Sequence, residues 1–222
     1  MQQVLRFPSY LWHYMDATPV APIHGLEARG TMTELVWLLF VAQLPAHPSS
    51  ARVQLWRHLR AAGAVSLQNG VWVLPAQEVH ERLLRDELAQ VERHGGTGLL
   101  FQAQALGHDL VGRFHDERDQ EYAEVCERCQ ALLDELARES RAGKETYAEL
   151  EENEQELGKL DRWLAQIQAR DFFGAPGAAH ATQAVEACRT DLAAFAAAVY
   201  RREGVMDGAD AAQSANMPKD EK

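Results

Sequence analysis

The 222-residue chain has few cysteines and no long apolar segment, and both features limit the classes of protein to which it can belong. Three cysteines are an odd number without the density of a disulfide framework, so we expect a reducing compartment. The longest uncharged apolar run, residues 35–45, is shorter than the ~20 residues that a membrane-spanning helix needs. A secretory signal is not indicated, because the sequence shows no basic segment that is followed by an apolar one. We therefore expect a cytoplasmic protein that has no membrane partner.

Positive charge is also scarce, and this limits the partners. The chain has 22 Lys and Arg against 33 Asp and Glu, a net charge of −11. An acidic chain binds polyanions poorly unless it carries a local basic surface. Residues 33–106 contain six arginines and six acidic residues, whereas residues 107–203 contain twelve basic and twenty-one acidic residues, a net charge of −9. Any contact with nucleic acid is therefore expected in the first of these segments.

The first segment contains a regular order of apolar patterns. The run 35–45 predicts a buried strand that Pro45 ends. Two amphipathic helical patterns, a hairpin signal at Asn69-Gly70 and a last apolar run follow it. The order strand, helix, strand, strand, helix, strand is typical of a ferredoxin-like α+β fold. The expected strands are 35–45, 64–67, 70–75 and 98–105, and the expected helices are 51–62 and 77–94.

Aromatic and histidine side chains of this segment are assigned by their place in the pattern. Tryptophans on the strands and the first helix are expected in the core: Trp37, Trp56 and Trp72. The histidines are dispersed and lack the paired spacing of metal ligands, so we expect them at the surface: His47, His58, His80 and His94. No metal site and no cofactor are predicted here.

From residue 107 the chain becomes rich in charge, leucine and alanine. Apolar side chains recur every three or four residues on both sides of a break near Gly143, which predicts two antiparallel helices with a heptad seam. After a second break at 171–177, residues 180–203 predict a third, alanine-rich helix. The predicted seam consists of Tyr122, Val125, Cys129, Leu132 and Leu136, then Leu150, Leu157, Leu160, Leu164 and Ile167.

The chain is thus expected to have four parts. Residues 1–32 are an irregular N-terminal extension, 33–106 a ferredoxin-like domain, 107–203 a helical hairpin with a third helix, and 204–222 a disordered tail. Two alternatives stay open for the extension: the native protein begins at Met32, or the extension is a genuine arm that packs or binds.

Six short segments, taken in order, carry a resemblance to a known family. They are Trp37-Leu38-Leu39, Leu44-Pro45, Ser50-Ala51-Arg52-Val53-Gln54-Leu55-Trp56-Arg57, Gly63-Ala64, Gly70-Val71-Trp72-Val73-Leu74-Pro75 and Arg170-Asp171-Phe172-Phe173-Gly174. Together they resemble the N-terminal domain of the chromate-resistance regulator ChrB over about residues 33–175. That domain is more distantly similar to the central domain of PaaX-type repressors and to small ferredoxin-like CRISPR-associated nucleases.

The resemblance implies a cytoplasmic regulator that represses a chromate-efflux operon until chromate appears. Operator DNA and chromate are then the implied partners. The full-length family has a second, C-terminal domain, and we expect an alanine-rich helix and a tail in its place here. A chain without that sensing domain is not expected to sense chromate alone.

Catalysis is not expected, and no catalytic residue is assigned. Metal-dependent cleavage of a phosphodiester needs carboxylates to hold the divalent ion. The nuclease relatives are expected to place an aspartate at the end of the first strand, where this sequence reads Ala42-Gln43-Leu44-Pro45. No aspartate occurs from residue 33 to residue 85.

The candidate binding residues are Arg52, Arg57 and Arg60 on the first helix. The planar guanidinium group donates two hydrogen bonds to one oxyanion, so these residues suit DNA phosphates or chromate. The start of the helix at Ser49 or Ser50 would add backbone N–H donors. The alternative is a solvated helix face that pairs with acidic residues of the helical hairpin.

Cys126 and Cys129 form a CxxC pair, but within the predicted heptad. A zinc site needs four ligands, and only Cys188 and scattered histidines are left to supply them. We therefore interpret the cysteines as small buried side chains of the seam, while a redox role toward chromate stays as the alternative.

Two functions follow as hypotheses. The first is a non-enzymatic, chromate-responsive repressor that binds operator DNA. The second is an accessory module that binds no DNA and pairs with a separate subunit of the C-terminal type. A homodimer, through the sheet edges or the helical seam, is a further expected partner state.

Overall fold

The computed structural model describes residues 35–47, 49–106 and 109–204. The chain forms two compact units. The first ends at Glu117 and also takes in Ala169–Ala175, and the second comprises Arg118–Gln168 and the residues from Pro176 onward. The predicted extension 1–32, and all but the first residue of the predicted tail, lie outside the described residues.

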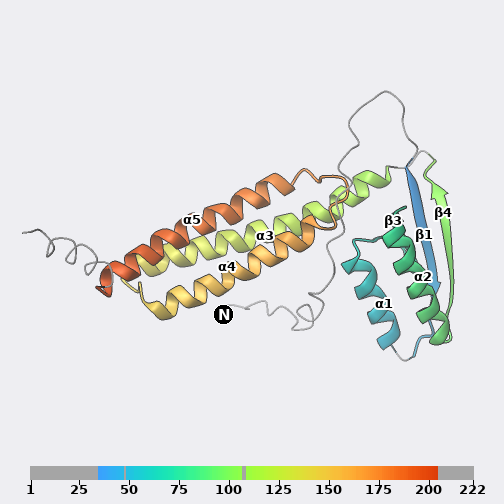
Figure 1. The fold of residues 1–222 in the computed structure, drawn as a ribbon, viewed down its shortest axis with the longest axis horizontal. Coiled ribbons are helices and arrows are strands. Elements are labelled where there is room, and N and C mark those ends of the chain that lie inside the picture. The colour runs from blue at the N-terminus through green and yellow to red at the C-terminus, as the bar shows by residue number, and fades with distance from the viewer. Residues whose placement is uncertain (1–34, 48, 107–108, 205–222) are drawn as a thin grey trace, which may run out of the picture. The chain divides into compact units, whose positions relative to one another are not determined.

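The first unit has an α+β fold, as the sequence predicts. Its four strands form one antiparallel sheet in the order β2-β3-β1-β4, with two helices between strands in the ferredoxin-like connection (Figure 1). The elements are β1 Val36–Gln43, α1 Ser50–Ala61, β2 Val65–Gln68, β3 Val71–Pro75, α2 Glu78–Arg93 and β4 Thr97–Gln104.

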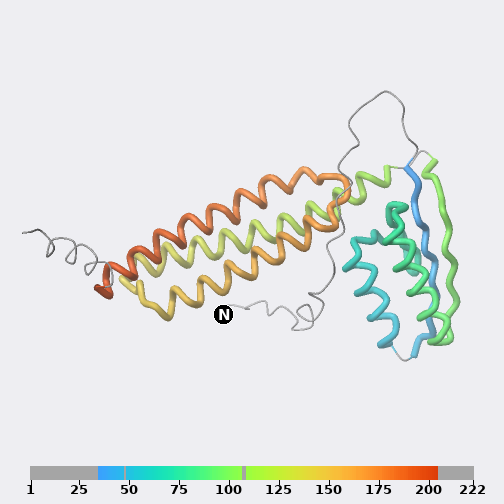
Figure 2. The backbone as a smooth tube through the Cα atoms, in the orientation of Figure 1, coloured from blue at the N-terminus to red at the C-terminus, as the bar shows by residue number. Residues whose placement is uncertain are grey.

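The two helices cover one face of this sheet (Figure 2). Phe40 and Trp72 are paired on neighbouring strands and are both buried. Gly98 of β4 also lies on that face, because a Cβ atom built on it would lie 2.6 Å from Leu88 of α2. Side chains alternate between faces along a strand, so Leu99 and Phe101 point away from α2. One face of β4 is therefore packed and the other is open.

Two glycines hold sharp turns in this unit. Gly63 ends α1 with φ +81°, and its N–H donates to the Arg60 carbonyl while the Ala64 N–H donates to that of Leu59. These two bonds form a Schellman motif, for which glycine is preferred. Gly70 has φ +75° in the turn between β2 and β3, which confirms the predicted hairpin.

An aromatic cluster closes one end of the sheet. Phe114, from the first turns of α3 (Leu110–Arg141), stacks on Trp37 of β1 with ring centroids 5.5 Å apart. Phe173 lies 5.4 Å from Phe114, and Phe172 packs edge-on against His80 at 4.9 Å. The expectation that His80 lies at the surface is wrong, because this contact leaves it 1% exposed. The Phe172-Phe173 pair thus belongs to the core of the first unit.

His80 should make the first unit sensitive to mild acid. Its Nδ1–H donates to the Pro75 carbonyl at 2.8 Å, and its buried Nε2 has no hydrogen-bond partner among the described residues. Burial lowers the pKa of His80 below its ordinary 6.5, against a smaller opposing effect of the Pro75 bond. The unfolded chain then binds more protons, so the free energy of unfolding falls as the pH drops below about 6.5.

The measurement is the free energy of urea unfolding as a function of pH, over about two pH units below pH 7. One extra proton bound by the unfolded chain gives a slope of up to about 1.4 kcal/mol per pH unit. His80→Gln keeps a donor for Pro75 and should flatten that slope. The control is His94→Gln, because His94 is exposed and its Nδ1–H donates to the Gln90 carbonyl. Equal slopes in wild type and His80→Gln would contradict the assignment.

The second unit consists of three packed helices. They are the remainder of α3, then α4 Tyr147–Gln168 and α5 Ala178–Arg202. All ten side chains of the predicted seam are buried, which confirms the heptad pattern. Within this seam the Asn153 amide donates to the buried Glu139 carboxylate at 2.9 Å. Among the described residues, no helix is long and apolar enough to cross a membrane.

Candidate nucleic-acid interface

The candidate interface is the outer side of α1. This helix contains no acidic residue, and its exposed side chains include Arg52, Val53 and Trp56. Arg52, Trp56 and Arg60 are spaced four residues apart, so they form one row along the helix. The N-cap residue is Ser49, one of the two predicted, but its side chain makes no capping hydrogen bond.

The three predicted arginines differ in how they are held. Arg52 is exposed, and its Nη1 donates to the Pro45 carbonyl at 3.1 Å. Arg57 is half-buried and is engaged in an interaction of its own. Arg60 is half-buried and forms an ion pair with Glu117 of α3. The Arg60 carbonyl also accepts a bond from Arg170 Nη1 at 3.1 Å, so this residue ties together distant parts of the first unit.

Trp56 is a surface residue, and the prediction that it lies in the core is wrong. Its side chain is 52% exposed, and Val53 beside it is 43% exposed. The core contacts of α1 are made instead by Leu55 and Leu59. An aromatic ring next to arginines is a common feature of nucleic-acid and protein interfaces. The signal in the sequence was the spacing of Trp56 between Arg52 and Arg60.

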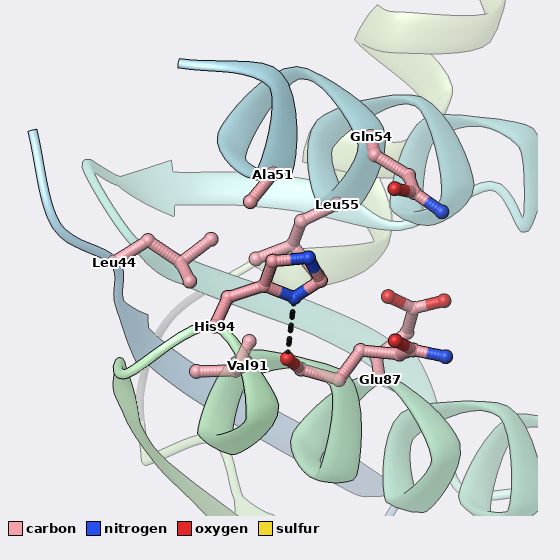
Figure 3. Close-up of a pocket in the computed structure, with 8 residues that line it drawn as sticks. Leu44, Ala51, Gln54, Leu55, Glu87, Val91 and His94 are labelled. Carbon is pink, nitrogen blue, oxygen red and sulfur yellow. Dashed lines mark hydrogen bonds between the residues drawn. The ribbon is translucent and has the colours of Figure 1, made fainter. Parts of the chain in front are cut away.

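The side of α1 that faces α2 offers no room for a ligand. A hollow of about 10 Å³ lies between the helices, lined by Leu44, Ala51, Leu55 and Val91 among others (Figure 3). This volume is about that of one water molecule and too small for a tetrahedral oxyanion. Farther along, His58 Nδ1 lies 2.5 Å from Glu87 Oε1, so a hydrogen bond joins the two helices. Binding is therefore expected on the outer side of α1.

The carboxylates of the described residues are not arranged for metal chemistry. No group of three or more His, Cys, Asp or Glu side chains in this part of the chain could hold a metal ion. The end of β1 is occupied by backbone contacts, with the Ala42 N–H donating to the Gly70 carbonyl at 2.8 Å.

Comparison with known proteins gives the family. A family model described as "Protein ChrB, N-terminal" matches residues 52–206, more than half of the chain. The chain belongs to the ChrB N-terminal family. Among curated proteins, Protein ChrB of Cupriavidus metallidurans is 29% identical over 101 residues, which are 45% of this chain and 31% of the relative. This chain therefore spans about a third of the length of that relative. The comparison with solved structures found no match.

The ChrB family match extends beyond the C-terminal end of the resemblance seen in the sequence, although it begins later in the chain. It begins in α1, at Arg52, and ends after α5. The alanine-rich helix is therefore part of the ChrB N-terminal region, and the expectation that it stands in the place of a later domain is wrong. The central strand β1 lies outside the matched residues.

The cysteines of this ChrB-family chain lie between α3 and α5. Cys129 and Cys188 are buried, and the Cys188 thiol donates to the Cys129 carbonyl at 3.4 Å. The pKa of the Cys129 thiol is raised to about 12. Burial is the largest cause, and the neighbouring Cys188 is the second. Cys126 is half-buried, and its Sγ lies 3.7 Å from His180 Nδ1. At neutral pH these groups are thiols, which are poor nucleophiles and poor metal ligands.

Proposed function

We propose that this chain is a non-enzymatic, chromate-responsive regulator of a chromate-resistance operon, and that it contacts operator DNA through α1. Membership of the ChrB N-terminal family supports the chromate context. The observation that carries the DNA contact is a helix free of acidic residues that exposes Arg52 and Trp56 together. The rest of the chain is acidic, so this is where a polyanion meets the least repulsion.

The residues of α1 have separate roles in this proposal. Arg52 and Arg57 neutralise phosphates, and this part of the binding depends on salt. Trp56 supplies apolar contact area and releases no counterions. Arg60 is a positioning residue, because its pair with Glu117 fixes the end of α1 next to α3.

The test is an electrophoretic mobility shift with a duplex that covers the DNA upstream of the gene, over a series of salt concentrations. Arg52→Ala with Arg57→Ala should abolish specific binding and reduce the salt slope by about 0.9 for each lost phosphate contact. Trp56→Ala should weaken binding and leave the salt slope unchanged. The same titration with and without chromate measures whether this chain responds to chromate by itself.

The matched control is Arg82→Ala on α2, because Arg82 is 72% exposed and is paired only with the exposed Glu78 in the described contacts. It removes the same charge from a different helix and should leave binding intact. An unchanged salt slope in the α1 double variant, or an equal loss in the control, would refute contact through α1.

An accessory module that binds no DNA is the second candidate. The net charge of −9 over residues 107–203 favours it, since a surface of that sign repels DNA. The Arg60–Glu117 pair favours it too, because it uses one of the three predicted contact residues within the first unit. Absence of any shift with the upstream duplex, together with capture of a separate chromate-resistance subunit by the purified chain, would support this alternative.

A further inference from the structure

The edge of the sheet in the first unit is unusually open. β4 is an edge strand of eight residues, from Thr97 to Gln104, and within the described residues no strand lies beyond it (Figure 1). Proteins commonly protect such edges with lysine, proline or a bulge. β4 has none of these, since its sequence is TGLLFQAQ and its register with β1 is unbroken. Along residues 97–103, no described strand pairs with the outer side of β4, so this stretch of backbone can accept another strand.

The open face of the sheet next to this edge is apolar. Leu99 is 58% exposed and Phe101 is 46% exposed, although both are large apolar side chains. They pair with Val41 and Leu39 of β1, which are only half-buried themselves. These four side chains form a continuous patch on the face that α1 and α2 leave uncovered, and we call it the β4 patch.

Charge decides which partner suits this edge. None of the residues in the four strands is charged, and the sequence around β4 has no Lys, Arg, Asp or Glu from residue 94 to residue 108. A nucleic acid would find no basic side chain here, and an acidic or basic peptide would find no opposite charge to pair with. A second copy of the chain brings an equally neutral strand, so no charge of either sign opposes the contact.

We propose that β4 pairs antiparallel with β4 of a second copy about a two-fold axis, which joins two four-stranded sheets into one. Antiparallel pairing of a strand with itself is self-complementary, as a two-fold dimer requires. An eight-residue strand spans about 27 Å and gains up to about eight backbone hydrogen bonds, and the two β4 patches become continuous.

The first test is the oligomeric state of the full chain by sedimentation, from low micromolar concentration upward. Wild type is expected to dimerise, and Phe101→Lys should weaken the dimer at least about ten-fold, because it places like charges close to the axis. The control is Val79→Lys on α2, where the side chain is 44% exposed and hence similar to Phe101. A wild-type chain that stays monomeric, or equal effects of both variants, would overturn the proposal.

The second test is hydrogen exchange in the wild-type chain, which does not depend on any variant. Outward-facing amides of β4 should exchange slowly in concentrated protein and rapidly after dilution below the dissociation constant. Amides that exchange rapidly at every concentration would exclude edge pairing. Amides that are slow at every dilution in a monomer would show that another segment of the same chain covers β4, and this would also overturn the dimer.

Discussion

Replacement of Gly63 by alanine is expected to lower the free energy of unfolding of the first unit by about 3 kcal/mol, from two additive causes. The left-handed backbone at φ +81° costs a residue with a Cβ atom about 1 kcal/mol. The new methyl group would also lie 2.8 Å from Arg170 Cβ and 3.1 Å from the Phe172 ring. Arg170 Cβ cannot move without its backbone, so overpacking adds about 2 kcal/mol.

Gly95→Ala is the matched control for this variant. Gly95 ends α2 in the same Schellman geometry, with φ +73°, but a Cβ atom built there has no neighbour within 4 Å. It should therefore lose only the backbone part, about 1 kcal/mol. Urea unfolding followed by tryptophan fluorescence gives both values. Equal losses in the two variants would show that the segment of Arg170 and Phe172 does not pack against Gly63.

The elements of the fold could be predicted because their signals are local. Pro45, Gly63 and the Asn69-Gly70 turn each act on the residues beside them, and the structure ends or turns the chain at each of these points. The heptad seam of the second unit was equally predictable, since the spacing of three and four depends only on helix geometry. The strand order β2-β3-β1-β4 then follows from the ferredoxin-like connection.

Exposure of single residues could not be predicted, because it depends on contacts between distant segments. Trp56 and Trp72 look alike in the sequence, but only Trp72 lies over the packed face of the sheet. His80 is on an ordinary amphipathic helix, and it is buried because Phe172 reaches it from ninety-two residues away in the sequence. Periodicity within one helix carries no information about such a partner.

The candidate site shows the same limit. The sequence indicated that Arg52, Arg57 and Arg60 share one side of a helix, and this follows from their spacing alone. It could not show that Glu117, on a helix that begins beyond the sheet, would pair with Arg60. The acidic partner that was considered as the alternative is thus found for Arg60, and the exposed Trp56 lies next to it in the same row of α1.

Phe114→Ala should have the other large effect, a loss of about 3–5 kcal/mol in the free energy of unfolding of the first unit. The side chain is 2% exposed and contacts Trp37, Phe172 and Phe173. Its removal leaves a cavity bounded by three rings that are fixed by their own strands and turns, so the site cannot collapse to fill it. Because Phe114 lies in the first turns of α3, the start of this helix should lose protection from hydrogen exchange as well.

Two control variants separate the contributions of Phe114. Phe114→Leu keeps most of the volume and loses the stacking on Trp37, so it should cost only about 1 kcal/mol. Phe101→Ala removes the same ring from a side chain that is 46% exposed. Measured in dilute protein, below the dissociation constant of the proposed dimer, it should cost well under half as much as Phe114→Ala. If Phe114→Ala and Phe101→Ala caused equally small losses in the free energy of unfolding, the aromatic cluster would not hold the start of α3 to the sheet. The ion pair between Arg60 and Glu117 would then be the main contact that holds it there. In that case Glu117→Gln should release the start of α3, which the same exchange measurement would detect.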